Sequence, residues 1–518
     1  MVLTIINNMM FNLKSSLLLM AAVPTSLFVK AQDSTRIFTK INNQYSIERN
    51  FRSQFYYNPA NKPDYSSSSF SEFSIGYHDD HRKVYREQLG AGDKGLSVSA
   101  SSFLKLNTNR SVWGEASYQN LKKRPFRWNE NLDYERIAPY ITADSLGGTL
   151  NVERYFFAGG LSQKINRWTL GGEVSYLAQL GYRSRDPRLK STTSDLSVNS
   201  GVNYKVFREY EVGVFGTVNK YTQNSSLTFQ SVLGKPFVYQ MTGLGNSNYF
   251  FSGGVNPSQT FEEFGYKGGI QISNKQGKDF YLKASAGRSN NTKSHKDKGS
   301  NTSFEISELE NKNFELEGAK FLTLKEKHRI GLSANYKAVV RTGSEFGYSV
   351  NTSATEQIFK RQAYRSENFM SSVKVLYQYS QDDFTVSASP FFGYEEIKER
   401  NLYPNSGQKF EYSYLGITAD YRQSINSDQM ISFRPYFSKR TVNKSINALS
   451  MTASKEINEW ILHDYQFQAS DITTFGASLR YDIKLEKLPA FFVCAEYRTQ
   501  KIQEKNNNFA GASLGITF

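Results

Sequence analysis

Cysteine, proline and long hydrophobic runs are all scarce in this sequence. Its 518 residues include one cysteine, Cys494, and 12 prolines, and only 39% of them are hydrophobic. A single cysteine excludes an intrachain disulfide framework and a metal cluster built on cysteines. A helix that crosses a bilayer needs about 20 consecutive apolar residues, and no stretch after residue 31 supplies them. A helical membrane protein and a disulfide-stapled secreted domain are therefore excluded.

The main apolar run lies at the N-terminus. Lys14 precedes the apolar segment 17–23, and Val29-Lys30-Ala31 places small residues at the positions that a signal peptidase reads. This order predicts a signal peptide over residues 1–31, with Gln32 first in the mature chain. The alternative is a buried N-terminal helix. Export leaves the periplasm, the outer membrane or the medium as the compartment.

Aromatic residues and positive charge are abundant by contrast. The sequence has 38 phenylalanines and 33 tyrosines, and its net charge is +15. Many aromatics and few aliphatics in a long exported chain favour a β-barrel, where only alternate residues face lipid and aromatic belts mark both interfaces. The charge predicts outer-membrane lipids and phosphorylated lipopolysaccharide as partners, and no nucleic acid. A solvated surface is the simpler explanation, because the charge is spread along the chain.

Alternation of apolar and polar residues is the strongest signal. Leu170, Val174 and Tyr176 share one parity while Glu173 and Ser175 share the other. Successive side chains on a strand point to opposite faces, so such segments have one apolar and one polar face. The same pattern recurs at 96–106, 330–340 and 475–483. These segments are longer than the 5–6 residues typical of soluble strands, and tilted membrane-spanning strands require that length.

The fold class predicted from this pattern is all-β, a large antiparallel transmembrane β-barrel over residues 70–518. Tight turns such as 165–167 and 426–428 alternate with long polar stretches, as short periplasmic turns and long extracellular loops do in such barrels. We count about 18 strands, including one over 464–485. Counts of 16 or 20 stay open, because 303–324 and 441–485 are ambiguous. The expected outer loops include 289–302, 342–366, 397–408 and 441–463.

The two ends of the mature chain carry separate signals. Residues 32–69 are too short for the plug domain of a TonB-dependent receptor, and they form either a periplasmic tail or a segment inserted into the lumen. At the other end, alternation runs from Ala510 to the terminal Phe518. A last strand that ends on phenylalanine resembles the signal read by the barrel assembly machinery, which is therefore an expected partner.

Several blocks of sequence resemble a Bacteroidota outer-membrane β-barrel family that is catalogued as a domain of unknown function. The blocks that carry the resemblance are 127–131, 139–145, 182–188, 242–245 and 512–518. The resemblance covers most of the mature chain and implies a barrel in the outer membrane. It also implies a role beside TonB-dependent uptake systems, with a TonB-dependent receptor or a surface lipoprotein as partner. It supplies no catalytic or ligand residues.

Charged residues on the polar parity of the strands are the candidate site. We expect them to line the lumen, where they either set the charge selectivity of a channel or pair and fill a closed interior. These residues are Lys105, Glu115, Glu173, Lys283, Lys337, Arg480, Asp482, Lys484, Glu496 and Arg498.

Metal binding and catalysis find little support. The dense group His78-Asp79-Asp80-His81 places its histidines on opposite faces of a strand, so no metal site and no cofactor is expected. No histidine lies in a serine-elbow or similar context, and we expect no enzyme. Two functions stay open, a transport channel or accessory barrel of an uptake system, and a structural protein whose outer loops bind a receptor, a surface lipoprotein or a glycan. An outer-membrane enzyme is the least favoured alternative.

Overall fold

The computed structural model describes residues 37–231, 235–253, 257–296, 302–350, 355–450, 453–485 and 488–518. Residues 37–518 form one structural unit. The expected signal peptide, residues 1–31, lies outside the described residues.

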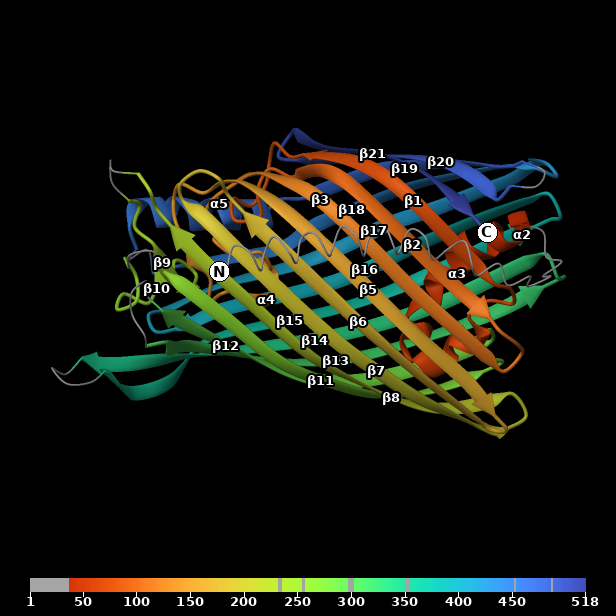
Figure 1. Cartoon of the computed structure of the whole chain (residues 1–518), viewed down its shortest axis with the longest axis horizontal. Coiled ribbons are helices and arrows are strands. Elements are labelled where there is room, and N and C mark those ends of the chain that lie inside the picture. The colour runs from red at the N-terminus through yellow and green to blue at the C-terminus, as the bar shows by residue number, and fades with distance from the viewer. Residues whose placement is uncertain are drawn as a thin grey trace, which may run out of the picture. The chain divides into compact units, whose positions relative to one another are not determined.

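Eighteen antiparallel strands form a single closed sheet (Figure 1). Each strand pairs with the next one in the chain, and β1 closes the ring on β21, with Ile75 opposite Leu514. The predicted fold class and strand count are therefore confirmed. The strands are β1 (Phe70–His81), β2 (Asp93–Lys105), β3 (Arg110–Phe126), β5 (Gly148–Ile165), β6 (Trp168–Tyr182), β7 (Arg188–Phe207), β8 (Tyr210–Thr228), β11 (Ser258–Asn274), β12 (Phe280–Lys296), β13 (Phe304–Leu324), β14 (His328–Val350), β15 (Thr355–Ser380), β16 (Phe384–Leu402), β17 (Asn405–Asn426), β18 (Gln429–Ala448), β19 (Ile472–Lys484), β20 (Ala490–Ile502) and β21 (Lys505–Thr517).

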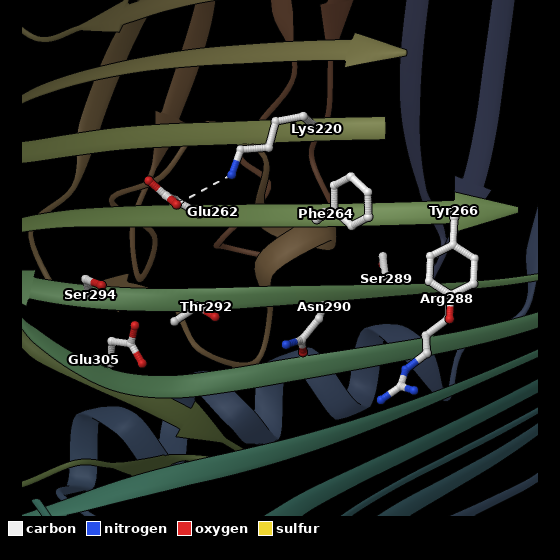
Figure 2. A pocket seen from close by; sticks show the side chains of 10 residues that line it. All are labelled: Lys220, Glu262, Phe264, Tyr266, Arg288, Ser289, Asn290, Thr292, Ser294 and Glu305. Carbon is white, nitrogen blue, oxygen red and sulfur yellow. Dashed lines mark hydrogen bonds and ion pairs between the residues drawn. The ribbon is translucent and has the colours of Figure 1, made fainter. Parts of the chain in front are cut away.

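The sheet has an apolar outer face and a polar inner face. On β6, the Leu170 and Val174 side chains are 43% and 49% exposed, whereas Thr169, on the opposite face of the same strand, is buried. Exposed aliphatic and aromatic side chains on one parity are what a lipid-facing wall presents. A polar pocket interrupts this outer face on β8, β11 and β12 (Figure 2).

The two ends of the barrel differ in their connections. At one end the links are short, and Asn166 and Arg208 adopt positive φ in tight turns. At the other end the strands run further than the sequence predicts. The expected long loop at 397–408 is wrong, because β16 and β17 continue to a hairpin with only residues 403–404 between them. In this hairpin the backbone pairing continues although the sequence no longer alternates between apolar and polar residues.

A helix replaces part of one expected strand. Helix α5 (Lys455–Gln468) begins at Ser454, whose side chain accepts a hydrogen bond from the Ile457 backbone, and it buries Ile457, Trp460 and Ile461. This helical spacing corrects the expected loop at 441–463 and the expected strand at 464–485, which begins only at Ile472.

Other short elements lie at the two ends of the barrel (Figure 1). The end with the long connections carries α4 (Tyr134–Ile137), α5 and a three-stranded sheet of β4 (Thr142–Ala143), β9 (Tyr239–Gly243) and β10 (Asn246–Ser247). The end with the short turns contains α2 (Ile37–Tyr45), α3 (Ile47–Phe51) and two 3₁₀ helices, η2 (Ser53–Tyr57) and η3 (Pro59–Asp64).

Candidate functional site

Residues 37–69, here named the inner plug, pack against the inner face of the barrel. Phe51 and Phe55 of the inner plug form a buried apolar cluster with Tyr281, Phe321 and Leu376. These three wall residues belong to β12, β13 and β15 and share the parity opposite to the exposed apolar side chains. The apolar part of the inner plug is thus stabilised directly by the wall.

Two wall glycines allow the inner plug to approach closely. A Cβ atom at Gly171 would lie 2.3 Å from the carbonyl carbon of Pro59, and one at Gly201 would lie 1.8 Å from the Asn58 Oδ1 atom. Any side chain at these positions would collide with the plug. The wall on β6 and β7 is therefore shaped to fit residues 58–59.

Amide side chains join the inner plug to two strands, β7 and β11. Asn58 donates to Asn203 at 2.9 Å, and Asn203 donates to Asn61 at 2.6 Å. Gln271 donates to the same Asn61 oxygen at 2.9 Å. All four side chains are buried, and each hydrogen bond contributes about 0.5–1.5 kcal/mol net.

Two wall arginines hold the C-terminal end of α2. Arg422 donates to the carbonyl oxygen of Tyr45 and to Asn42 Oδ1, at 3.0 Å for the latter, and Arg434 donates to the same Tyr45 carbonyl. Asp420 pairs with both arginines, at 2.8 and 2.9 Å, and its side chain is only 1% exposed. Cations at a helix C-terminus satisfy its unpaired carbonyls and its dipole.

A third arginine, Arg480, anchors the start of the barrel to its last strands. It pairs with Glu72 at 2.9 Å and with Asp482 at 2.8 Å. Its guanidinium also lies 4.5 Å from the centre of the Tyr45 ring, and Tyr45 donates to Glu72. Arg480 therefore links β1, β19 and the inner plug in one network.

Between the two ends, inward-pointing charged side chains remain exposed to solvent. Glu115, Lys337 and Glu496 lie on the inward parity of β3, β14 and β20, yet each is exposed. Glu173 accepts a hydrogen bond from the Trp113 indole at 2.5 Å. The middle of the barrel is thus polar and open to water, unlike the region filled by the inner plug.

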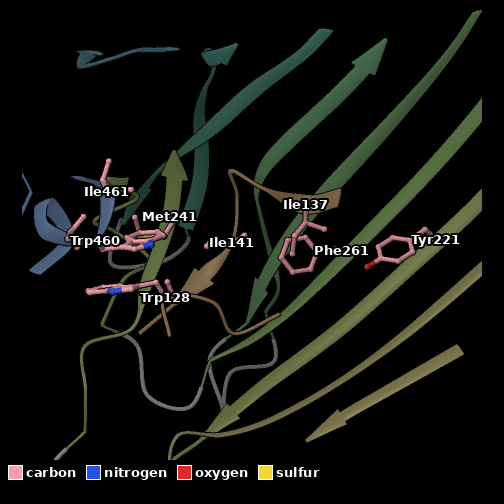
Figure 3. Packing of buried hydrophobic residues seen from close by; sticks show 10 residues of the cluster. Trp128, Ile137, Ile141, Tyr221, Met241, Phe261, Trp460 and Ile461 are labelled. Atoms are coloured by element: carbon pink, nitrogen blue, oxygen red, sulfur yellow. The ribbon is translucent and has the colours of Figure 1, made fainter. Parts of the chain in front are cut away.

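The opposite end is closed by segments 82–92, 127–147, 235–253 and 453–471, here named the outer cap. Its core contains Trp128, Ile141, Met241, Trp460 and Ile461 (Figure 3). The Trp128 and Trp460 rings stack, with centroids 5.1 Å apart and an interplanar angle of 8°. The outer cap therefore has an apolar core largely of its own.

Charged residues fix the outer cap to the inner wall. Arg136 of α4 pairs with Asp195 at 2.7 Å and with Glu263 at 2.9 Å, and its guanidinium lies 3.9 Å from the Tyr221 ring centre. At the other side of the cap, Arg440 of β18 donates to the backbone oxygen of Ser470 at 2.7 Å, just beyond the C-terminus of α5.

One carboxyl group of the outer cap is wholly removed from water. Glu130 accepts two hydrogen bonds of 2.6 Å from Arg183, and both side chains are almost fully buried. Burial raises the pKa of the Glu130 carboxyl well above its ordinary value, although Arg183 acts in the opposite direction.

A cavity of about 380 Å³ separates part of the outer cap from the wall. Lys123, Asp133, Tyr134, Arg136 and Asp195 line it, so it presents both signs of charge. Such a cavity suits a polar or zwitterionic solute better than an apolar one.

The charged residues expected to line the lumen all lie on the inward parity of their strands, but at three different levels. Those beside the inner plug are Lys105, Lys283, Arg480 and Asp482. Those in the middle are Glu115, Glu173, Lys337, Glu496 and Arg498, whose guanidinium lies 4.9 Å from the Phe509 ring centre. Lys484 is exposed at the end of the barrel that has the short turns.

The histidine group on β1 is dispersed in the structure. His78 bonds to Asp93 at 2.6 Å and stacks on Phe509, while His81 is exposed at the end of the strand. The described ranges contain no group of three or more His, Cys, Asp or Glu residues able to hold a metal ion. Among the described residues, no helix has the length and apolarity needed to cross a membrane.

The sequence analysis missed the arginines that hold α2, and a signal for them was present. Asp420 and Arg422 lie on the polar parity of a segment whose other parity holds Leu415, Ile417 and Tyr421. The same rule that selected Arg480 therefore selects them as well. The partners of Arg136, by contrast, come from strands 59 and 127 residues away, and no local pattern indicates them.

Comparison with known proteins gives one family and several weak structural likenesses. The model of a family of unknown function, DUF6850, matches residues 59–518. No curated protein matches the chain. The siderophore receptor PiuA from Acinetobacter baumannii is 6% identical, with a TM-score of 0.40 over 88% of this chain and 82% of that one. The ferric enterobactin receptor PfeA from Pseudomonas aeruginosa is 9% identical, with a TM-score of 0.38 over 88% and 81%. Likenesses this weak carry no argument about function.

Proposed function

The chain belongs to the family of unknown function DUF6850, and we propose that it is an outer-membrane conduit for a polar solute, closed at rest by its inner plug. The observation that carries this proposal is the contrast inside the barrel. In the middle, Glu115, Lys337 and Glu496 point inward and are exposed to solvent, whereas Lys283 and Asp482, at the level of the inner plug, are buried. The barrel wall thus encloses a hydrated, charged interior, and the inner plug is a separate segment of chain. If the inner plug moves aside, a polar solute can pass through that interior.

The outer face supports the placement in the outer membrane. Its exposed apolar side chains share one parity on strand after strand, as on β6, β8 and β11. Burying that surface in lipid is favourable, and a closed sheet leaves no unpaired backbone groups inside the hydrocarbon. A barrel of ~18 strands is also wide enough for an aqueous channel when nothing fills it.

The contacts of the inner plug favour reversible displacement. Most of its specific contacts are hydrogen bonds and ion pairs, such as those of Arg422 and Asn203. If the plug leaves, water replaces it and solvates these groups, so the net loss is about 0.5–1.5 kcal/mol for each neutral hydrogen bond. A wholly apolar plug would expose a hydrophobic wall and would be far harder to release.

Bilayer conductance tests the proposal directly. Replacing residues 37–64 by a Gly/Ser linker of equal length removes all four helices of the inner plug but keeps the length of chain before β1. We expect the full chain to conduct poorly and the linker variant to conduct as an open pore. Both proteins should migrate faster unboiled than boiled in SDS gels, which shows that the barrel is intact. A linker variant that stays closed, or a full chain that conducts freely, contradicts the proposal.

A second function is favoured by the outer rim. Tyr249 is 89% exposed, Ile358 60% and Tyr403 58%, all beyond the part of the barrel that would contact lipid. Exposed apolar side chains at such a rim suit a protein partner, and we propose a TonB-dependent receptor or a surface lipoprotein. In that role the chain is an accessory barrel of an uptake system. Cross-linking on intact cells from a photoreactive residue at position 249 would capture that partner, and a matched residue at position 427, in a short turn, would not.

The last strand of the barrel bears on how the protein is assembled into the membrane. Phe518 exchanges backbone hydrogen bonds with Ser71 at the seam between β21 and β1, and we propose that this last strand is read by the barrel assembly machinery. We propose no catalytic step for this chain. Phe518→Ser should lower the amount of protein in the outer membrane, and normal assembly of that variant would contradict the assembly role.

A further inference from the structure

A polar pocket of about 500 Å³ lies on the outward face of the barrel, where an apolar wall is otherwise expected. It spans β8, β11, β12 and the start of β13, and Figure 2 shows the side chains that these strands contribute, Glu305 of β13 among them. Its lining includes Lys220, Glu262, Phe264, Tyr266, Arg288 and Asn290.

Strand register fixes the height of this outer-wall pocket. Phe264 pairs with Lys220 and Asn290, and Asn274, ten residues along the same strand, pairs with Tyr210 and Phe280. At about 3.4 Å per residue and a tilt of about 40°, the level of Phe264 and the level of Tyr210 and Phe280 are roughly 25 Å apart along the barrel axis. That separation equals the usual height of the lipid-facing band between aromatic girdles. The pocket therefore lies at the girdle on the side of the outer cap.

The pocket lining balances Lys220 and Arg288 against Glu262 and Glu305, and its cations lie on the side of the apolar wall. Arg288 and Lys312 are paired neighbours on β12 and β13, and both contact the single carboxylate of Glu310, at 3.3 Å from Lys312. Lys220 has only a loose contact with Glu262, at 3.5 Å, and both of these side chains are more than half exposed. Cations in this arrangement are available to an incoming anion.

A strip of small residues leads from the pocket into the apolar band. Directly beneath Tyr266 and Arg288, the register aligns Gly216, Gly268 and Ala286 on the same face. A Cβ atom at Gly216 or Gly268 would meet only a backbone oxygen, 3.8 or 3.9 Å away, so the surface there is shallow and unfilled. Such a strip accommodates an acyl chain lying along the wall.

We infer that the outer-wall pocket binds the phosphorylated sugar headgroup of an outer-leaflet glycolipid, with an acyl chain along the small-residue strip. Arg288 and Lys220 would bind the phosphate, because a guanidinium offers two parallel donors to its oxygens. The Asn290 amide oxygen, whose nitrogen already donates to Glu308, and the Glu262 carboxylate accept hydrogen bonds from sugar hydroxyls, and Phe264 and Tyr266 flank the ring with apolar faces. The inference rests on the outer-membrane placement in the proposed function, but not on conduction.

Native mass spectrometry of the full chain in detergent tests this inference. The probes are a monophosphorylated diglucosamine glycolipid, its dephosphorylated form and inorganic phosphate. The test variant is the double substitution Lys220→Ala and Arg288→Ala. The control is Lys320→Ala, because Lys320 also pairs with a carboxylate, Asp279, and lies 5.8 Å from an aromatic ring centre, that of Phe280, but at the other girdle.

We expect the phosphorylated glycolipid to bind the full chain and Lys320→Ala equally, and the double variant about tenfold more weakly, as loss of charge-assisted hydrogen bonds predicts. Equal binding of the dephosphorylated lipid would overturn the phosphate site. Displacement by inorganic phosphate at equal concentration would show that the pocket reads free phosphate and not a lipid. Equal weakening in Lys320→Ala would show non-specific attraction.

Two further measurements separate this inference from the proposed function. Each variant should keep its heat-dependent migration in SDS gels, which excludes loss of folding as the cause of weak binding. The wild-type chain should fractionate with the outer membrane. If it does so and the glycolipid fails to bind, only the pocket inference is wrong, whereas fractionation elsewhere contradicts the placement on which both depend.

Discussion

The inner plug and the outer cap occupy the two ends of the same barrel and are held there by different means. Both contain a helix near whose C-terminus a wall arginine donates to backbone oxygens, and Arg434 and Arg440, on one strand, serve α2 and α5 respectively. The apolar contacts differ. Those of the inner plug are made with wall residues such as Phe321, whereas the outer cap stacks Trp128 on Trp460 within itself.

This difference shows that the inner plug depends on the barrel wall for its apolar packing, whereas the outer cap depends on it less. The inner plug joins the strands only at Phe70, while each segment of the outer cap is connected to strands at both of its ends. In the proposed displacement the plug would therefore leave the wall as one piece, whereas the cap segments stay tethered at both ends. Variants that affect one closure and spare the other make the comparison testable.

The largest effect is expected from Trp460→Ala. Removing this buried ring takes away the stacking partner of Trp128 and should destabilise the outer cap by about 3–5 kcal/mol. Protease added to intact cells should cut the cap segments faster, while the bilayer conductance stays low because the inner plug is untouched. Leu462→Ala, on the exposed face of the same helix, should change neither the rate of protease cleavage nor the conductance. Conductance that rises with Trp460→Ala would show that the cap, and not the plug, closes the pore.

A slightly smaller effect is expected from Arg422→Ala. The substitution leaves Asp420 paired with Arg434 alone and removes donors from Asn42 and Tyr45, at a cost of about 3 kcal/mol. Protease added from the periplasmic side should then cut residues 37–58 faster. Arg440→Ala is the mirror variant and should expose the end of α5 on the cell surface instead. If both variants loosen the same end, the two closures are not independent.

Steric displacement of the plug should cost less. Gly171→Val places a side chain against Pro59 and should cost about 1–3 kcal/mol through overpacking, with leak conductance as the readout. The neighbouring Gly172 points outward and a Cβ atom there meets nothing within 4 Å, so Gly172→Val is a matched control on the same strand. An equal leak from both variants would mean that the barrel itself, and not the plug, is disturbed.

The smallest effect concerns charge in the middle of the barrel. In the variant without the inner plug, Arg498→Glu should shift the reversal potential toward cation preference by a few millivolts with no measurable loss of stability. Arg480→Glu is not equivalent, because Arg480 is committed to Glu72 and Asp482. Lys312→Glu makes the same charge change on the outward face and should leave the reversal potential unchanged.

The barrel was predictable because its signal is repeated on every strand. Alternation such as Leu170, Val174 and Tyr176 against Glu173 follows from an apolar outer face and a polar inner face. The same signal failed at α5, where Ile457, Trp460 and Ile461 have helical spacing after the capping Ser454. It failed again at 397–408, because β16 and β17 continue there as a paired hairpin whose sequence has no apolar–polar alternation.

The candidate site was predictable only in part. Parity selects Arg480 and Asp482 as inward residues, but it does not say that Glu72 and Tyr45 will meet them from the other end of the chain. Whether 32–69 forms a tail or an insert depended on contacts spread over many strands, such as Asn58 with Asn203 and Arg422 with Tyr45. Such contacts follow from closure of the ring and leave no local pattern.

The covalent continuity between the inner plug and β1 has a kinetic consequence. Once displaced, the plug stays attached beside the mouth it has left, because only residues 66–69 separate its last anchored aromatic, Tyr65, from Phe70. A partner held by so short a linker has an effective concentration in the millimolar range. Closing is then a first-order event whose rate does not depend on how much protein the membrane contains. A free peptide with the sequence of the plug would have to reach about millimolar concentration to compete, so in the proposed cycle each barrel would close with its own plug.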